Sequence, residues 1–101
     1  MSFHGNAKQN PKPHHLYCIM DKEMDDVFKY GISDKPIGED GLSRRMREQI
    51  SFLNLLSKWL RYFGKVMILN IPGRAEAAKI ERAHIDAYRE KYGQNPLGNR
   101  K

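Results

Sequence analysis

Two strand-like segments near the start of the chain place the strongest constraint on its fold. HLYCIM (15–20) and VFKYGIS (27–33) are rich in apolar and aromatic residues, and the polar stretch 21–26 separates them. Two such runs joined by a short polar turn are typical of a β-hairpin, so the sequence predicts one here. Gly31 lies inside the second run, and a glycine inside a strand marks a place where another group approaches the backbone closely.

The rest of the chain predicts two helices and a third strand. A helix is expected over residues 43–62 with Ser43 as its N-cap, and a break is allowed near 54–57. The continuous apolar run at 65–71 predicts a strand covered on both faces. The periodicity of 74–92 predicts a last helix. The order β-β-α-β-α indicates an α+β domain in which helices flank a small three-stranded sheet, antiparallel or mixed.

One domain is expected from a chain of 101 residues. Residues 1–13 are polar and contain proline, glycine and asparagine, so they are expected to form a flexible lead-in, with the domain over 14–101. No apolar run reaches the ~20 residues of a membrane span, and the start lacks a signal-peptide core. Export would therefore require another route or a larger parent protein.

The charge of the chain favours a polyanionic partner. Lys and Arg number 18 against 12 Asp and Glu, which gives a net charge of +6 and a pI near 9.6. Nucleic acid is one such partner, and a charge that serves solubility alone is the alternative of about equal weight. The single cysteine, Cys18, excludes an internal disulfide, and the four histidines show no zinc-site spacing.

Glu81 has the least expected position in the chain. On a helical wheel of 74–92 it falls near the centre of the apolar stripe, where an ionised carboxylate is costly unless paired, hydrogen-bonded or bound to metal. Two interpretations are open: an ion pair with an arginine of the preceding helix, or a carboxylate held in a cleft to coordinate a divalent cation. His84 lies on the same side, where a lone histidine is more often packed than catalytic.

The order of these elements resembles the GIY-YIG nuclease superfamily, also called the URI fold. Its members carry two short motifs on a β-hairpin, an arginine on the next helix, a glutamate on a later helix and often an asparagine near the end. The resemblance extends over residues 14–99. The positions that match are HLY (15–17), KYG (29–31), Arg45, Glu81 and Asn99, with Asn95 as the alternative to Asn99.

Three longer segments further resemble the C-terminal nuclease domains of bacterial polymorphic toxins. They are HGNAKQNPKPHHLYCIMDKE (4–23), GLSRR (41–45) and NIPGRAEAAKIE (70–81). This resemblance implies a domain of a larger effector that is delivered into the cytoplasm of a target bacterium and neutralised by an immunity protein; otherwise the domain would be cytoplasmic. It also implies a nucleic-acid substrate, with DNA favoured over RNA because most of the superfamily acts on DNA.

The KYG motif leaves the register of the hairpin open. If Met20 opposes Val27, then Tyr17 faces Tyr30 and Lys29 points to the other face of the sheet. A shift by one residue opposes Tyr17 to Lys29 instead. The motif match favours the second arrangement, accommodated by a bulge, with Lys29 in the site and Tyr30 as a core aromatic.

The resemblance implies phosphodiester hydrolysis with one divalent metal, Mg²⁺ or Mn²⁺. Glu81 would hold the metal, and Tyr17 would act as the general base with help from the metal or from Lys29. Arg45 would neutralise phosphate oxygens, and Gly31 would let the backbone lie close to the substrate.

Other residues are expected around this centre. Arg44 and Arg47 would contact outer phosphates of the nucleic acid, and Asn99 would contact it or brace the site by hydrogen bonds. His15 and His84 would assist from outside the site; for His15 the alternative is a surface position beside the lead-in.

Two other classes of function compete with a nuclease. A non-catalytic nucleic-acid-binding module would show salt-sensitive binding and no metal-dependent cleavage. A small interaction domain would have no cleft, and Glu81 would pair directly with Arg45.

Overall fold

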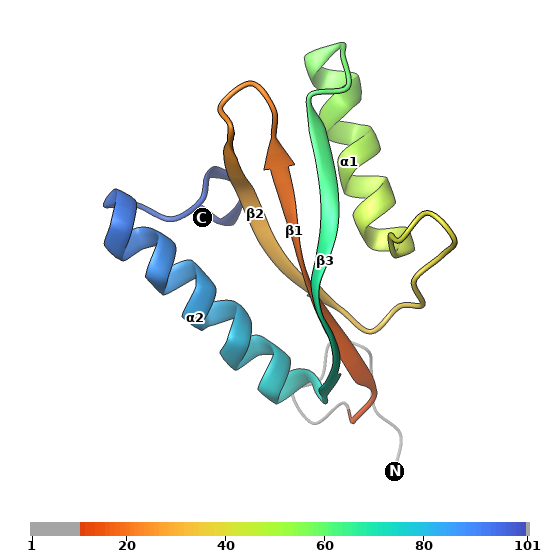
Figure 1. Ribbon diagram of the computed structural model, residues 1–101. Helices are drawn as coiled ribbons and strands as arrows, with labels where there is room; N and C mark the ends of the chain where they lie inside the picture. The colour runs from red at the N-terminus through yellow and green to blue at the C-terminus, as the bar shows by residue number, and fades with distance from the viewer. Residues whose placement is uncertain (1–10, 101) are drawn as a thin grey trace.

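The protein, described by a computed structural model over residues 11–100, has one antiparallel sheet and two long helices (Figure 1). The elements in chain order are β1 (Pro13–Asp21), β2 (Asp26–Ser33), α1 (Arg44–Ser57), β3 (Tyr62–Pro72), α2 (Arg74–Tyr92) and the short 3₁₀ helix η1 (Leu97–Asn99). The strand order is β2-β1-β3, with both pairs antiparallel. The predicted α+β order is therefore confirmed. Residues 1–10 of the predicted lead-in lie outside the described part of the chain.

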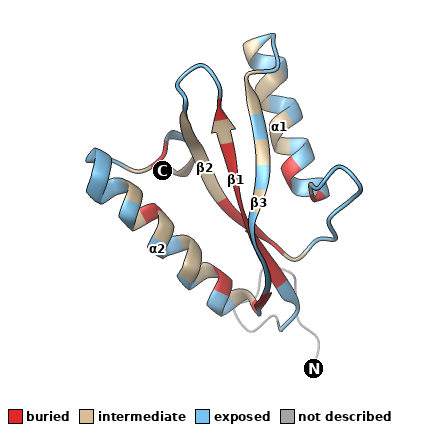
Figure 2. Ribbon diagram, viewed as in Figure 1, coloured by how far each residue is buried: buried red, intermediate tan, exposed pale blue. Residues whose placement is uncertain are grey.

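The two helices pack on opposite faces of the sheet, as the alternation of side chains along β1 requires. Leu16 belongs to the apolar cluster that Ala77 of α2 completes, and the next residue, Tyr17, belongs to the cluster that Met46 of α1 completes. All four side chains are fully buried. The central strand β1 therefore carries the core of both layers, and residues 14–19 are all buried (Figure 2).

The first helix begins as predicted and ends earlier. Ser43 is the N-cap, and its hydroxyl accepts a hydrogen bond from a backbone N–H of the first turn. The helix ends at Ser57, and Lys58 adopts a left-handed conformation (φ 66°). The prediction that it continues to Tyr62 is wrong because Asn54 bonds both backbone groups of Tyr62, at 2.7 and 3.1 Å, and so starts β3 there.

The third strand lies at an edge of the sheet, and the prediction that it is covered on both faces is wrong because several of its apolar side chains are exposed. Met67, Ile68 and Leu69 expose between 37 and 58 % of their surface. A continuous apolar run does not distinguish a covered strand from an edge strand. Large apolar side chains are also exposed on α1 and on the segment after it, where Figure 2 shows a mixture of exposed and half-buried positions. The exposed side chains are Phe52, Leu55, Leu56, Trp59 and Leu60.

The β1–β2 hairpin contains a bulge, but it does not produce the pairing of Tyr17 with Lys29 for which the sequence predicted one. Met20 pairs with Val27 and Ile19 pairs with Lys29, so Phe28 is an extra residue on β2. A bulge of this kind changes the register by one residue between the turn and the far end of the hairpin.

Both predicted pairings of Tyr17 are wrong in detail. Tyr17 pairs with Gly31, and neither Tyr30 nor Lys29 lies opposite it. Because Ile19 and Tyr17 share a face of β1, the partner of Ile19, Lys29, lies on the Tyr17 side of the sheet. Tyr30 lies on the other side, half-buried with its ring 5.4 Å from that of His84. Among residues 11–100, no helix is long and apolar enough to cross a membrane.

Candidate active site

A recess of about 200 Å³ beside β2 collects residues from β1, β2, α1, α2 and η1. It brings together most of the residues that the sequence motifs single out and adds Arg74. The residues that line this recess are Tyr17, Lys29, Tyr30, Gly31, Ile32, Arg45, Arg74, Glu81 and Asn99.

Tyr17 explains the glycine in the second motif. A Cβ atom at position 31 would lie 2.3 Å from Cζ of Tyr17 and 2.4 Å from its hydroxyl, closer than real Cβ contacts come. The group that approaches the backbone of Gly31 is therefore the phenol of Tyr17, directly across the strand pair.

The Tyr17 hydroxyl is a hydrogen-bond donor in this structure. It donates to Oε1 of Gln49 on α1 at 3.1 Å, and the side chain is fully buried. Burial raises the pKa of Tyr17, and its interactions with Arg45 and Gln49 act in the opposite direction without cancelling the effect. The phenol is therefore protonated near neutral pH, and it interacts with the guanidinium of Arg45.

Glu81 is half-buried in the recess and surrounded by positive charge. Burial raises the pKa of this carboxyl group, whereas the charges of Arg74, Lys29 and Arg45 lower it less strongly. None of the ion pairs among residues 11–100 involves Glu81. The interpretation of Glu81 as the partner of an arginine from α1 is therefore wrong, and the carboxylate faces a cleft.

Lys29 is half-buried on the same side of the sheet as Tyr17. Burial lowers its pKa, the charge of Arg45 lowers it further, and Glu81 opposes both. The 3₁₀ helix packs against this residue, since a Cβ at Gly98 would lie 2.8 Å from Cβ of Lys29. The recess therefore holds an amine and a carboxylate that both lose solvation.

Asn99 braces β2 through its backbone. Its Oδ1 accepts from the N–H of Tyr30 at 2.8 Å, and its Nδ2 donates to the carbonyl of the same residue at 2.9 Å. The side chain therefore continues the hydrogen-bond ladder at the free edge of β2. The alternative position, Asn95, does not line the recess; it lies on a neighbouring cavity that Glu81 and Asn99 also line.

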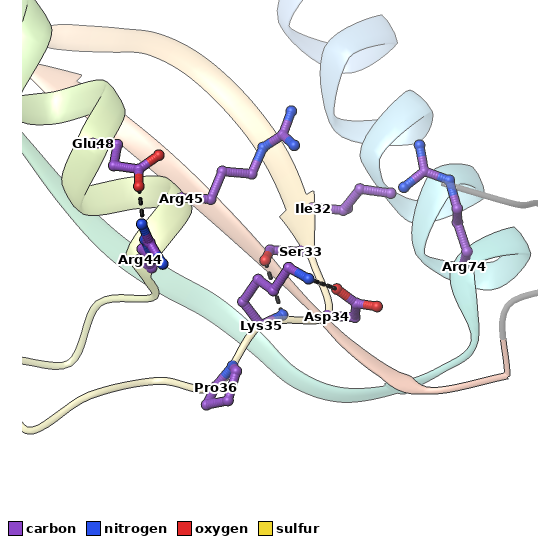
Figure 3. Close-up of a pocket in the computed structure, with 9 residues that line it drawn as sticks. All are labelled: Ile32, Ser33, Asp34, Lys35, Pro36, Arg44, Arg45, Glu48 and Arg74. Atoms are coloured by element: carbon purple, nitrogen blue, oxygen red, sulfur yellow. Dashed lines mark hydrogen bonds and ion pairs between the residues drawn. The ribbon is translucent and has the colours of Figure 1, made fainter. Parts of the chain in front are cut away.

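Arg44 and Arg47 lie outside the recess. Arg47 forms a bidentate pair with Asp40 at 2.8 and 3.2 Å and also bonds a loop carbonyl, so its guanidinium is occupied in the structure. Arg44 pairs with Glu48 at 2.8 Å. It lines a wider cavity of about 750 Å³ that shares Ile32, Arg45 and Arg74 with the recess (Figure 3). The other residues of this wide cavity are Ser33, Asp34, Lys35, Pro36 and Glu48.

The two histidines lie next to the recess without lining it. His15 is buried, and its ring centroid is 6.1 Å from that of Tyr17, so the alternative of a surface position is wrong. Burial lowers the pKa of His15, which keeps this ring neutral near pH 7. His84 stacks against Tyr30, and its Nδ1 lies 2.9 Å from the carbonyl of Ile80.

A resident metal site made by the protein alone does not fit these residues. Among residues 11–100, no three His, Cys, Asp or Glu side chains are grouped to hold an ion. Glu81 supplies one carboxylate amid the charges of Lys29, Arg45 and Arg74. Mg²⁺ is commonly held by one or two carboxylates together with substrate phosphates. The donor set therefore fits a divalent cation that binds jointly with a phosphate.

Arg74 is the lining residue that sequence reasoning missed. It lies seven residues before Glu81 on α2, a spacing of two helical turns that puts both on one face. That spacing was the available signal, and Arg74 also lies within the segment 70–81 that resembles toxin domains, but it is not one of the positions matched to the superfamily motifs above.

Comparison with known proteins identifies the family. The model of the family described as URI fold toxin 2 matches residues 7–93, which is most of the chain. Searches of curated proteins and of solved structures gave no match. The resemblance to the URI fold and to toxin domains is therefore confirmed. The chain belongs to the URI fold toxin 2 family.

Proposed function

We propose that this toxin domain is a metal-dependent endonuclease that hydrolyses phosphodiester bonds of nucleic acid, with DNA preferred to RNA. The observation that carries this proposal is Glu81, a half-buried carboxylate without an ion pair among the described residues, which faces a recess lined by Tyr17, Lys29 and Arg45. One anionic and several cationic side chains in a small recess suit a ligand that brings both charges, such as a phosphodiester with its divalent cation.

The cations of the recess bind and orient the phosphate in this proposal. Arg45 offers a planar set of donors to the phosphate oxygens, and Lys29 adds a point charge. The same Arg45 guanidinium interacts with the Tyr17 hydroxyl in the free protein. Its transfer to a phosphate would release the phenol from one of its partners.

Tyr17 and Glu81 have separate tasks in the reaction. Glu81 would hold Mg²⁺ or Mn²⁺ together with the phosphate, and such an ion would supply stabilisation of the leaving oxygen and of developing charge. Tyr17 would first lose its own proton to solvent, and the resulting phenolate would accept a proton from the attacking water. Because the pKa of Tyr17 is raised in the free protein, this role would need nearby positive charge, which Lys29 supplies in the recess and a bound cation would increase.

A cleavage assay tests the proposal. The domain is incubated with plasmid DNA and with total RNA, in Mg²⁺ or in EDTA, beside the Glu81→Gln variant and the control Glu90→Gln, an exposed carboxylate on the same helix. We expect the wild type and Glu90→Gln to cleave in Mg²⁺. Cleavage should be absent in EDTA and absent for Glu81→Gln. Cleavage that survives both treatments contradicts the mechanism, and binding without any cleavage supports a non-catalytic nucleic-acid-binding module instead.

Membership of the toxin family supports an inference about the cellular context. We infer delivery into the cytoplasm of a target bacterium as part of a larger effector, and neutralisation by an immunity protein. An acidic surface on that protein would complement the basic recess, so its association rate should fall as ionic strength rises.

A further inference from the structure

The wide cavity beside the recess has an excess of positive charge that its own carboxylates do not neutralise. Among residues 11–100, four basic and two acidic residues line it, which leaves a difference of +2. Each carboxylate has a partner in the cavity wall: Glu48 with Arg44 at 2.8 Å, and Asp34 with Lys35 at 4.0 Å (Figure 3).

Arg45 and Arg74 account for this excess. Neither forms an ion pair with a carboxylate among residues 11–100. They come from α1 and α2 and extend toward the space between these helices (Figure 3). Both also line the recess with Glu81, so they stand between the two cavities.

The position of Arg74 does not serve the stability of its helix. It is the first residue of α2, where a positive side chain opposes the helix dipole, and the N-cap Gly73 provides no side-chain cap. Ile32 and Pro36 give the wide cavity an apolar part next to this charge. A basic wall with an apolar part is suited to a sugar–phosphate backbone and less to a free small anion.

We propose that the wide cavity binds the nucleic-acid backbone that flanks the scissile phosphate, with Arg74 on the phosphate adjacent to the one at Arg45. This inference rests on the proposed nuclease function for the position of the scissile phosphate. In this arrangement the two arginines have separate tasks. Arg45 acts at the reacting phosphate, and Arg74 guides the nucleic-acid strand from one cavity to the other.

The test measures binding, so it does not depend on cleavage. Fluorescence anisotropy of a short fluorescein-labelled oligonucleotide is recorded in EDTA over a series of salt concentrations, with every variant made in the full-length Glu81→Gln chain. The variants are Arg74→Gln, Arg74→Lys and the control Lys79→Gln, which removes one exposed positive charge from the same helix. Circular dichroism melts check that each variant is folded.

We expect Arg74→Gln to weaken binding about tenfold at low salt and to reduce the slope of log K against log salt by about one phosphate contact. Arg74→Lys should keep the slope, and Lys79→Gln should match the parent. Equal effects of Arg74→Gln and Lys79→Gln would overturn the inference, because the loss would then be general charge. If the Glu81→Gln parent shows the Arg74-dependent slope but the wild type cleaves nothing, the binding site stands and the nuclease proposal fails.

Discussion

The phenol of Tyr17 lies against the backbone of Gly31, its partner across the β1–β2 pair, with no room for a side chain between them. The glycine of the KYG segment is therefore required in this chain by a neighbour in its own hairpin. This contact also places the hydroxyl of Tyr17 at the recess that Glu81 faces.

Substitution of this glycine should therefore disturb the protein through Tyr17. We expect Gly31→Ala to lower the free energy of unfolding by about 1–3 kcal/mol, the usual cost of overpacking a core, as measured by urea denaturation. The loss should be smaller in a Tyr17→Leu background, which lacks the ring. Strictly additive losses would show that another contact is responsible.

Removal of the Tyr17 hydroxyl should separate stability from chemistry. Tyr17→Phe leaves Oε1 of Gln49 without its donor, which should cost about 1 kcal/mol of unfolding free energy. If Tyr17 is the general base, cleavage should fall by about 10²–10⁴-fold. The control is Tyr92→Phe, an exposed tyrosine on α2, which should keep full activity. Near-normal cleavage by Tyr17→Phe would exclude the phenol as the base.

Neutralising Glu81 should stabilise the fold while it removes activity. Because burial raises the pKa of Glu81, ionisation of this group opposes folding above the ordinary glutamate pKa near 4.3. Glu81→Gln should therefore melt at a higher temperature than the wild type at pH 7, and the difference should shrink as the pH falls to 4. Cleavage should drop at least about a hundredfold. A lower melting temperature at pH 7 would indicate that the carboxylate is held by a stabilising contact.

Asp21 should control acid stability at the other end of the sheet. Its carboxylate accepts two bonds from Arg61 at 2.8 Å each and two from backbone N–H groups of the hairpin turn, and the Arg61 interaction lowers the pKa of Asp21. This contribution is complete above the ordinary aspartate pKa near 4 and is lost as the pH falls through the lower folded value. Asp21→Asn should cost about 2 kcal/mol at pH 7 in chemical denaturation.

The comparison for this prediction is Asp40→Asn, which breaks a more exposed pair with Arg47. The loss of unfolding free energy at pH 7 should be clearly smaller for Asp40→Asn than for Asp21→Asn in the same chemical denaturation, because water competes for exposed ion pairs. Equal effects of the two substitutions at pH 7 would contradict the assignment of acid stability to Asp21.

The elements of this fold were predictable because each has a local signal. Alternation and the polar turn identify the hairpin, Ser43 identifies the start of α1, and the position of Glu81 on an apolar stripe marks the cleft. Each of these signals lies within a few turns of one helix or within two adjacent strands.

The remaining features depend on contacts between distant residues. The pairing of Tyr17 with Gly31 follows from an extra residue in β2, Phe28. The periodicity of the two strands does not show where such an extra residue lies, so it does not determine the register. Arg74 is an ordinary helical arginine until α1 brings Arg45 to the other side of the same space. The end of α1 likewise depends on the bonds between Asn54 and Tyr62.

The bulge at Phe28 has a practical consequence for anyone who wishes to alter the protein. The unpaired residue Phe28 lies between two sets of β1–β2 pairs, those next to the turn and those from Lys29 onward. The second set is therefore aligned with β1 independently of the turn. We therefore expect the effect of an insertion at the exposed turn, residues 22–25, to extend no further than Phe28. The pairing of Tyr17 with Gly31, and of Ile19 with Lys29, should stay as it is. An affinity tag or fluorescent label can be carried at this tip, at the far end of the hairpin from the chemistry.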